Sequence, residues 1–276
     1  MKTLLVFNDG TPQGTHAAKF ALVIARGLEA NILVANACKT VDVMHKEKIF
    51  TVDGDETVRD CEPELTGALI KLSDQNAGFR PEMKEMDVTL FNETQLAEFS
   101  NKEQIWMIIR GATHHSSTTL SKEHINFNTL MNKVRCPLLM VPLHWSIKQI
   151  ERMVYIADLR YCRIQFVRFL IELAKPWSAI VSIANLSAKG LPDMREEYAT
   201  AVFKDEICAN VKYDNLLLNN IREKDLTKAV DVMINGLHND LLVMVNHRFH
   251  FEEIVGPYIT EEFPELITIP LLIFPY

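Results

Sequence analysis

The feature of this sequence that most restricts its fold is an internal repeat. An apolar run that ends at Asp9, residues 4–9, returns 149 residues later as residues 153–158, which end at Asp158. After each run, apolar residues recur at the spacing of one helix face, which predicts an amphipathic helix. A duplicated unit implies that one arrangement of strands and helices is built twice. We therefore expect the same order of elements in both halves of the chain.

The ends of the two halves share a second pattern. Residues 135–142 and 268–275 both contain the frame Pro-Leu-Leu-x-x-Pro. Proline is tolerated at the end of a strand or at the edge of a sheet, because it cannot donate a hydrogen bond to a neighbouring strand. We expect both segments to be short final strands that lie at or near a sheet edge.

Between these landmarks, apolar strands alternate with amphipathic helices. The expected inner strands are 31–35, 87–91 and 105–109 in the first half and 179–184, 214–218 and 241–245 in the second, and the clearest helical stretches are 56–75, 192–210 and 226–237. Continuously apolar strands that alternate with helices are typical of a parallel sheet covered on both faces. We predict an α/β protein with two tandem Rossmann-like domains, residues 1–144 and 150–276, each with a five-stranded parallel sheet flanked by helices.

Composition excludes several classes of protein. The 29 basic and 36 acidic residues give a formal charge of −7, and nucleic-acid binding needs a basic surface. No run of 18 apolar residues occurs, and Asn8-Asp9-Gly10 interrupts the apolar start, so we expect no membrane span, no signal peptide and a cytoplasmic location. The five cysteines are far apart and form no Cys-x-x-Cys pair, so we expect core thiols rather than disulfides.

With this organisation, the sequence resembles the universal stress proteins, in the tandem form known from Bacteroidetes-type bacteria. The resemblance rests on the first strand ending at Asp9, on the strand–Gly111–loop–helix segment with its Cys136-Pro137-Leu138 ending, and on the same order in the second half. It implies a fold like that of the adenine nucleotide alpha hydrolases and a stress-response or regulatory role. In single-domain relatives, two copies pair through their last strands. The resemblance thus implies that residues 136–142 and 269–275 pair within one chain as a pseudo-dimer, and a homodimer of whole chains stays open.

The resemblance also implies a nucleotide site. A nucleotide-binding subset of the family carries Gly-x2-Gly-x9-Gly-(Ser/Thr) after the fourth strand, and here that pattern falls on Gly111, His114, His124 and Ile125, so that only its first glycine is kept. Asn126 follows and is a candidate N-cap for a helix whose first amides could face phosphate. The corresponding loop of the second half, residues 247–257, is shorter and contains two glutamates that we expect to repel phosphate.

The aspartates that close the repeated strands have a role in the family, where the matching residue contacts the adenosine part of the ligand. A carboxylate at the carboxyl end of a parallel strand lies where open α/β sheets bind ligands. The alternative is that Asp9 and Asp158 only accept hydrogen bonds in turns or cap the next helix. The candidate site comprises Asn8, Asp9, Gly111, His114, His124 and Asn126 in the first half and Asp158 in the second. The expected ligand is an adenine nucleotide, AMP or ADP more readily than ATP.

Other kinds of site have weaker support in the residues. The histidines His114, His115 and His124, or His247 and His250, could suggest zinc, but they lack the helical i, i+4 spacing and the glutamate of a metalloprotease site. Residues 116–119 are rich in hydroxyl groups beside His115, but no Gly-x-Ser-x-Gly elbow surrounds them. We therefore name no catalytic residue and no metal ligand.

The expected function is binding rather than catalysis. We expect any adenine nucleotide to bind weakly, through a degenerate site in the first half, and the other possible partner is a protein. Two alternatives remain. In the first, both sites are degenerate, and the protein is a scaffold or a sensor of a non-nucleotide small molecule. In the second, it hydrolyses adenine nucleotides slowly. Binding of a ligand to the native state alone raises the unfolding temperature, so titration with adenine nucleotides separates the leading hypothesis from the scaffold.

Overall fold

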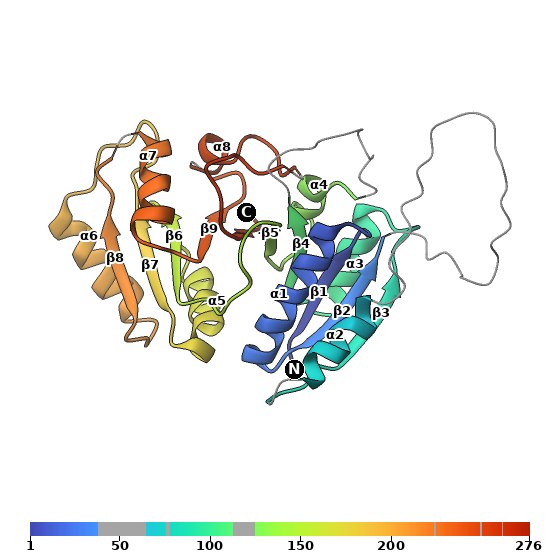
Figure 1. Cartoon of the computed structure of the whole chain (residues 1–276). Helices are drawn as coiled ribbons and strands as arrows, with labels where there is room; N and C mark the ends of the chain where they lie inside the picture. The colour runs from blue at the N-terminus through green and yellow to red at the C-terminus, as the bar shows by residue number, and fades with distance from the viewer. Residues whose placement is uncertain (38–64, 76–77, 113–124, 224, 249, 261) are drawn as a thin grey trace, which may run out of the picture.

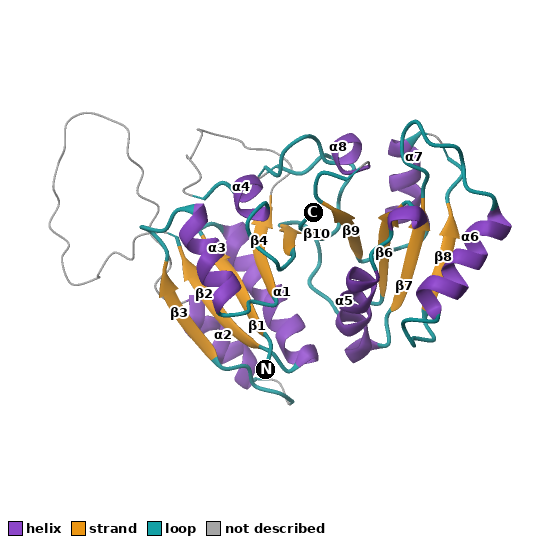
Figure 2. Ribbon diagram, turned by 180° about the vertical axis from the view of Figure 1, so that it is seen from behind, coloured by secondary structure: helices purple, strands orange, loops and turns teal. Residues whose placement is uncertain are grey.

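The computed structural model describes residues 1–37, 65–75, 78–112, 125–223, 225–248, 250–260 and 262–276 of the chain (Figure 1). Within these residues, ten strands form one sheet in the order β3-β2-β1-β4-β5-β10-β9-β6-β7-β8. Helices cover the sheet on both faces (Figure 2). The predicted α/β class is confirmed.

The first five strands lie on one side of the sheet. They are β1 (Thr3–Asn8), β2 (Asn31–Asn36), β3 (Met83–Asp87), β4 (Met107–Ala112) and β5 (Leu138–Pro142), and all of their pairings are parallel. The helices between them are α1 (Pro12–Leu28), α2 (Leu65–Asp74), α3 (Glu93–Lys102) and α4 (Phe127–Met131). Helix α1 contacts α2, and α3 contacts α4. This is the grouping that right-handed crossovers on the two faces of a parallel sheet produce.

The last five strands repeat this order. They are β6 (Arg152–Ala157), β7 (Ile180–Asn185), β8 (Leu216–Asn220), β9 (Leu241–Val245) and β10 (Leu271–Phe274), again with parallel pairing throughout. The connecting α-helices are α5 (Ile164–Ala174), α6 (Glu196–Val202), α7 (Leu226–Asp231) and α8 (His250–Ile254). Short 3-10 turns, η1 (Leu159–Tyr161) and η2 (Lys175–Trp177), flank α5, and π-helical turns, η3 (Phe203–Cys208) and η4 (Val232–Gly236), extend α6 and α7.

The two halves of the sheet join through their last strands. β5 and β10 pair antiparallel over three residues each, with Leu139 opposite Leu272 at the centre. The contact that the resemblance implied between the last strands is therefore present within the chain. We expected both strands at or near an edge, and each is the last strand of its own five, but together they lie in the middle of the ten-stranded sheet. The frame prolines fit because they lie outside the three paired positions.

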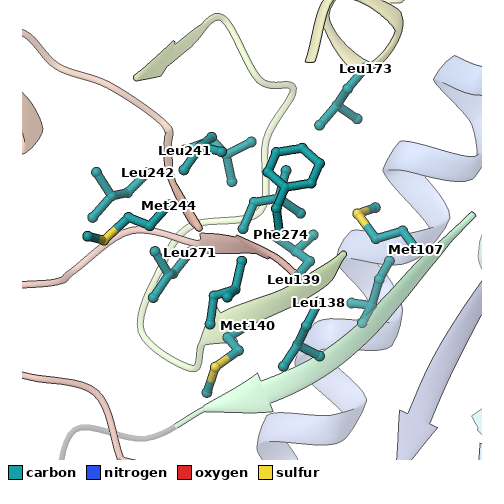
Figure 3. Packing of buried hydrophobic residues seen from close by; sticks show 14 of the residues in the cluster. Met107, Leu138, Leu139, Met140, Leu173, Leu241, Leu242, Met244, Leu271 and Phe274 are labelled. Atoms are coloured by element: carbon teal, nitrogen blue, oxygen red, sulfur yellow. The ribbon is translucent and has the colours of Figure 1, made fainter. Parts of the chain in front are cut away.

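Apolar side chains fill the region around this joint. Figure 3 shows leucine and methionine side chains of β4, β5, β9 and β10 packed together with Leu173 of α5. Aromatic rings extend this packing: Trp106 of the first half stacks on Phe169 of the second with ring centroids 4.0 Å apart, and within the second half Phe166 stacks on Phe274 at 4.3 Å. The Lys2 ammonium pairs with the Glu172 carboxylate at 2.8 Å beside them. The halves thus share a continuous core.

Two strand positions differ from those expected. The third strand of the first half is β3, Met83–Asp87, and not 87–91, and β8 begins two residues later than the predicted 214–218. β3 is an edge strand with several exposed side chains, so its polar sequence does not show the apolar run that we searched for. In place of the predicted strand, Val88 is buried in the turn after β3, where its N–H donates to the Asn36 carbonyl.

Candidate functional site

The pairing registers make the two halves comparable residue by residue. Leu4 of β1 lies opposite Met107 of β4, and Met153 of β6 lies opposite Leu241 of β9. Counting forward from these pairs, Asp158 takes the place of Asp9 and Val245 takes the place of Gly111. In each half, the carboxyl ends of these neighbouring strands border the crevice in which open α/β sheets bind ligands. We call the crevice between β1 and β4 the amino-half crevice and the one between β6 and β9 the carboxy-half crevice.

The first turn of α1 packs into the amino-half crevice. A Cβ atom on Gly111 would lie 2.3 Å from the carbonyl carbon of Gln13 and 2.5 Å from its oxygen. A Cβ atom on Gly14 would lie 2.6 Å from Oδ1 of Asp9. Both glycines are therefore required for close approach between the strand ends and the helix. The space that Gly111 leaves at its α-carbon is taken up by the protein's own backbone.

Asp9 and Asn8 take part in local hydrogen bonds that begin α1. Asp9 Oδ1 accepts from the N–H of Thr11 at 3.0 Å and from its hydroxyl at 2.6 Å. The same hydroxyl accepts from the N–H of Gly14 at 3.1 Å and so caps the helix. The buried Asn8 amide donates to Asn36 Oδ1 at 2.8 Å, joining the ends of β1 and β2. These contacts are the hydrogen bonds of a turn and of a helix cap, which are the contacts we expected for Asp9 if it only has a structural role.

The other first-half candidates are only partly described. Asn126 is the N-cap of α4, as expected, and its side chain accepts from the N–H of Thr129 at 2.9 Å. Its own N–H donates to the Glu93 carboxylate at 2.9 Å, which places a negative charge beside this helix start. His114 and His124 lie outside the described residues, as do His115 and residues 116–119.

The carboxy-half crevice contains a cavity. The turn η1 stands between Asp158 and the start of α5 at Ile164, whereas α1 starts at Pro12, three residues after Asp9. The later helix start leaves a small cavity of about 30 Å³, the volume of about one water molecule, which opens to solvent. The residues that line the cavity come from β6, η1, the start of α5, the end of β9 and α8: Tyr155, Ile156, Ala157, Asp158, Tyr161, Arg163, Phe166, Met244, Val245, Arg248, His250 and Phe251.

Tyr155 contributes a polar group to this otherwise apolar interior. Its side chain is 1% exposed and lines the cavity. Within the part of the chain that the structure describes, no hydrogen-bond partner reaches its hydroxyl. Burial raises the pKa of the phenol, with the nearby Cys162 thiol acting in the same direction and the charges of Arg163 and Arg248 opposing it. The hydroxyl therefore keeps its proton at neutral pH and can donate a hydrogen bond into the cavity.

Two arginines of the cavity wall, Arg163 and Arg248, lie over aromatic rings. The Arg248 guanidinium lies 4.5 Å from the ring centroid of Tyr276 and 5.8 Å from that of Tyr161. The Arg163 guanidinium lies 5.5 Å from the Tyr276 ring and 5.6 Å from the Phe166 ring. Cations above aromatic faces at these distances are attracted to the rings. The rings therefore hold both arginines beside the cavity.

Asp158, the predicted residue of this half, has its carboxylate occupied. Its side chain is fully buried, and both oxygens face Arg160, with Oδ1 at 2.8 Å from Nε and Oδ2 at 2.7 Å from Nη2. Oδ2 also accepts from the N–H of Ala188 at 3.0 Å. Burial alone would raise the pKa of Asp158, but these hydrogen bonds and the Arg160 charge hold it below its usual value. Asp158 therefore borders the cavity as half of a neutral pair.

His250 is the other titratable group of the cavity wall. Its Nε2 lies 2.9 Å from the carbonyl oxygen of Leu186, so the proton is on this nitrogen. Burial lowers the pKa of His250, which is neutral at pH 7. The glutamates Glu252 and Glu253, which we expected to repel phosphate from this loop, are exposed on α8, and neither lines the cavity. The cavity wall therefore carries the positive charges of Arg163 and Arg248.

The described residues contain no group of three histidine, cysteine, aspartate or glutamate side chains that could hold a metal ion. Of the cysteines, Cys136 is buried, and burial raises the pKa of Cys136 and of Cys162 to about 12, so both are unreactive thiols. Cys38 and Cys61 lie outside the described residues. In the part of the chain that the structure covers, no helix has the length and apolar character needed to cross a bilayer.

The residues that the sequence reasoning missed are Tyr155, Tyr161, Arg163 and Arg248. One signal could have pointed to Tyr155: it is the only residue with a hydroxyl group in the apolar run 153–158. Nothing in the sequence pointed to the arginines, because arginines near strand ends are common. Their position beside the cavity depends on where α5 and α8 begin.

Comparison with known proteins rests on structure, since no protein-family model and no curated protein sequence matches this chain. A universal stress protein from Archaeoglobus fulgidus DSM 4304 superposes over 99% of this chain and 97% of its own, with a TM-score of 0.55 and 9% identity. A functionally unknown protein from Pseudomonas aeruginosa PAO1 covers 99% and 92%, with a TM-score of 0.53 and 11% identity. A candidate universal stress protein from Pseudomonas aeruginosa UCBPP-PA14 covers 99% and 93%, with a TM-score of 0.52 and 12% identity. The chain therefore has the fold of the universal stress proteins over its whole length.

Proposed function

We propose that this protein is a tandem universal stress protein that acts in a stress response or in regulation by binding a small ligand in its carboxy-half crevice. The two units that we assign, residues 1–144 and 150–276, share one sheet but have different crevices. In the first, the start of α1 lies against Gly111, and in the second, the cavity remains. This difference supports a division of roles, with one unit as a structural partner and the other as the binding unit.

The observation that carries the proposal is the Tyr155 hydroxyl. The Tyr155 side chain lines the cavity, and its hydroxyl forms no hydrogen bond within the described residues. The hydroxyl does not belong to the fully enclosed polar atoms that lack a partner, so we assign it no desolvation penalty. A ligand in the crevice can accept a hydrogen bond from it.

Adenine nucleotides are the first ligands to test, because the resemblance implies them. AMP or ADP fits the proposal better than ATP, since the cavity offers two guanidinium groups and no glycine-rich phosphate loop. The amino-half alternative, with Asp9 near the adenosine and Gly111, His114, His124 and Asn126 near the phosphates, uses different residues. The two sites can therefore be separated by substitution.

Thermal unfolding and calorimetric titration with adenosine, AMP, ADP and ATP test the proposal on the wild-type chain, on Tyr155→Phe and on Asp9→Ala. We expect AMP or ADP to raise Tm, an effect that Tyr155→Phe weakens and Asp9→Ala leaves unchanged. Loss of binding in Asp9→Ala alone would move the site to the amino half. The hydrolase alternative predicts slow release of phosphate from ATP that Asp9→Ala abolishes.

The scaffold alternative predicts no shift with any nucleotide and no small molecule retained by the protein. Mass spectrometry of material released from freshly purified protein decides between this alternative and a non-nucleotide ligand. A retained small molecule other than a nucleotide supports the sensor form of the proposal, and an empty protein with flat titrations supports the scaffold. A cytoplasmic location and a homodimer of whole chains remain predictions that fractionation and light scattering can test.

A further inference from the structure

We propose that the amino half contains a separate ligand site, a polar cavity beside the first turns of α1 that binds the phosphate group of a small hydrophilic molecule. The cavity has a volume of about 410 Å³. Ligand pockets in proteins have volumes of about 300–1,000 Å³. Neither Asp9 nor Gly111 lines this cavity, so it differs from the nucleotide site that the resemblance implied. It also lies outside the carboxy-half crevice, and the inference does not depend on the function proposed for that crevice.

The cavity lies where the start of α1 meets the segment that follows β5. Residues 10–12, one face of α1 and Leu143 form its wall. Two contacts hold this junction in place. The ring of Phe20 packs against that of Trp145 with centroids 4.7 Å apart, and Nε2 of His16 lies 2.9 Å from the Trp145 carbonyl oxygen. The wall is therefore fixed by contacts within the protein before any ligand binds.

Most side chains of the wall are polar. They are those of Thr11, Thr15, His16 and Lys19. The hydroxyl of Thr11 caps α1, whereas that of Thr15 forms no hydrogen bond with another described residue. Hydroxyl, imidazole and ammonium groups form hydrogen bonds with the hydroxyl groups and oxyanions of a ligand. The wall therefore fits a hydrophilic molecule better than an apolar ring.

The charge at the cavity is positive. Lys19 is exposed, and in the part of the chain that the structure describes its ammonium group forms no ion pair. The Asp9 carboxylate, at the same helix start, accepts a hydrogen bond from the Thr11 hydroxyl at 2.6 Å and does not line the cavity. The amino end of α1, a helix of 17 residues, adds the positive end of its dipole. A phosphate dianion in this cavity therefore meets a cation without a competing carboxylate in the wall.

The electrostatics of His16 are consistent with this excess of positive charge. Burial lowers the pKa of His16, and the nearby Lys19 and His144 lower it further, against the effect of the hydrogen bond to the Trp145 carbonyl. The ring is therefore uncharged near pH 7, with its proton on Nε2. An anion in the cavity would offset the charges of Lys19 and His144 and raise the pKa of His16. Anion binding and protonation of this ring are thus coupled.

The first experiment compares glucose 6-phosphate, inorganic phosphate and glucose, each titrated into the full-length protein at pH 7 and constant ionic strength. Calorimetry gives the affinity, and the amide NMR shifts of Gly10, Thr11 and Thr15 give the place of binding. We expect glucose to bind at least tenfold more weakly than glucose 6-phosphate, because hydrogen bonds that involve an ionised group are stronger than neutral ones. Glucose 6-phosphate should also bind more tightly than inorganic phosphate. Equal affinities of these two would overturn the hydrophilic body and leave the free ion as the ligand.

The variants are Lys19→Gln and Thr15→Val, with Lys175→Gln as the matched control. Lys175 is an exposed residue of η2, which contacts α1, so its substitution removes a positive charge near that helix without altering the cavity wall. We expect Lys19→Gln to weaken binding of glucose 6-phosphate about tenfold, Thr15→Val about threefold and the control less than twofold. Circular dichroism spectra and Tm values without ligand show that the variants are folded.

Sulfate tests the coupling to His16, because its own charge does not change near neutral pH. We expect sulfate to raise the pKa of His16, read from the resonance of its ring proton, and to bind more tightly at about pH 6 than at about pH 8. His16→Gln should make this pH dependence smaller. A pKa of His16 that sulfate leaves unchanged would place the anion elsewhere and overturn the site.

The outcomes separate this inference from the proposed function. Equal weakening by Lys19→Gln and Lys175→Gln would reduce the effect to long-range charge and overturn the site. Tyr155→Phe, in the carboxy-half crevice, should leave the binding of glucose 6-phosphate unchanged, and a loss in that variant would move the phosphate to that crevice. Absence of binding by all probes would overturn the inference, and the titrations with adenine nucleotides would still decide the proposed function.

Discussion

Substitution of Gly111 by alanine tests whether this glycine serves packing or ligand approach. Gly111 does not have a positive φ, so its backbone conformation suits any residue. The difficulty is space: the new Cβ would lie 2.3 Å from the carbonyl carbon and 2.6 Å from the Cβ of Gln13. Relaxed contacts between carbon atoms are about 3.5–4.0 Å. The first turn of α1 would thus have to move by about 1 Å away from the strand.

The expected cost follows from what has to move. Overpacking a core costs about 1–3 kcal/mol, and the clash here involves the backbone of Gln13 rather than the end of a flexible side chain. We therefore expect Gly111→Ala to lower the free energy of unfolding by about 2–3 kcal/mol. With an entropy of unfolding of about 2.1 cal/mol/K per residue, that corresponds to a fall in Tm of about 3–5 °C.

The assay is urea denaturation of the ligand-free protein, with thermal unfolding as a second measurement. Gly67→Ala is the matched control, because Gly67 lies in α2 with no atom within 4 Å of the added methyl group. Alanine is favoured over glycine inside a helix by about 0.5–1 kcal/mol, so this variant should be more stable than the wild type. A Gly111→Ala protein of wild-type stability that no longer binds nucleotide would refute the packing argument and restore a ligand role for Gly111.

Three further predictions follow from buried contacts. Arg160→Met should destabilise the protein by about 2–4 kcal/mol, because it leaves the Asp158 charge buried without a partner. Asp158→Asn should cost only about 1–2 kcal/mol, because the remaining Arg160 can reach water. The side chain of Asp158 is 0% exposed and that of Arg160 is 26% exposed, so equal losses in urea denaturation would contradict this reasoning. Burial lowers the pKa of His250 below 6.5, so on acidification the unfolded chain takes up this proton at a higher pH than the folded chain does. The stability of the protein should therefore fall as the pH drops from about 7 to 5. His250→Gln should make that fall smaller in denaturation measured at several pH values, and an unchanged fall would show that other groups cause it. Leu272→Ala, at the fully buried centre of the joint between β5 and β10, should cost about 2–5 kcal/mol; a loss below about 1 kcal/mol would show that the joint packs loosely.

Much of the fold was predictable because it depends on patterns that repeat along the chain. Apolar strands 4–9 and 153–158 lie where the repeat placed them, and the two Pro-Leu-Leu frames are the last strands of their halves. These strands are buried on both faces, so their sequences are continuously apolar and easily recognised. The edge strand β3 was misplaced because one side of it faces water and its sequence is largely polar.

The site was less predictable because it depends on small differences between the halves. Asp9 and Asp158 occupy equivalent positions, yet one begins a helix through Thr11 and the other is bound to Arg160. The cavity depends on the turn η1, which delays the start of α5 relative to α1. The pattern of apolar residues does not show how many residues separate a strand from the next helix. The positions of Arg163 and Arg248 beside one cavity depend on that separation.

A crystal structure of the protein with AMP bound tests most directly whether the ligand site lies between β6 and β9. We expect AMP in the carboxy-half crevice, within hydrogen-bond distance of the Tyr155 hydroxyl. Ligand bound beside Asp9 at the end of β1, with the cavity next to Tyr155 empty, would contradict it.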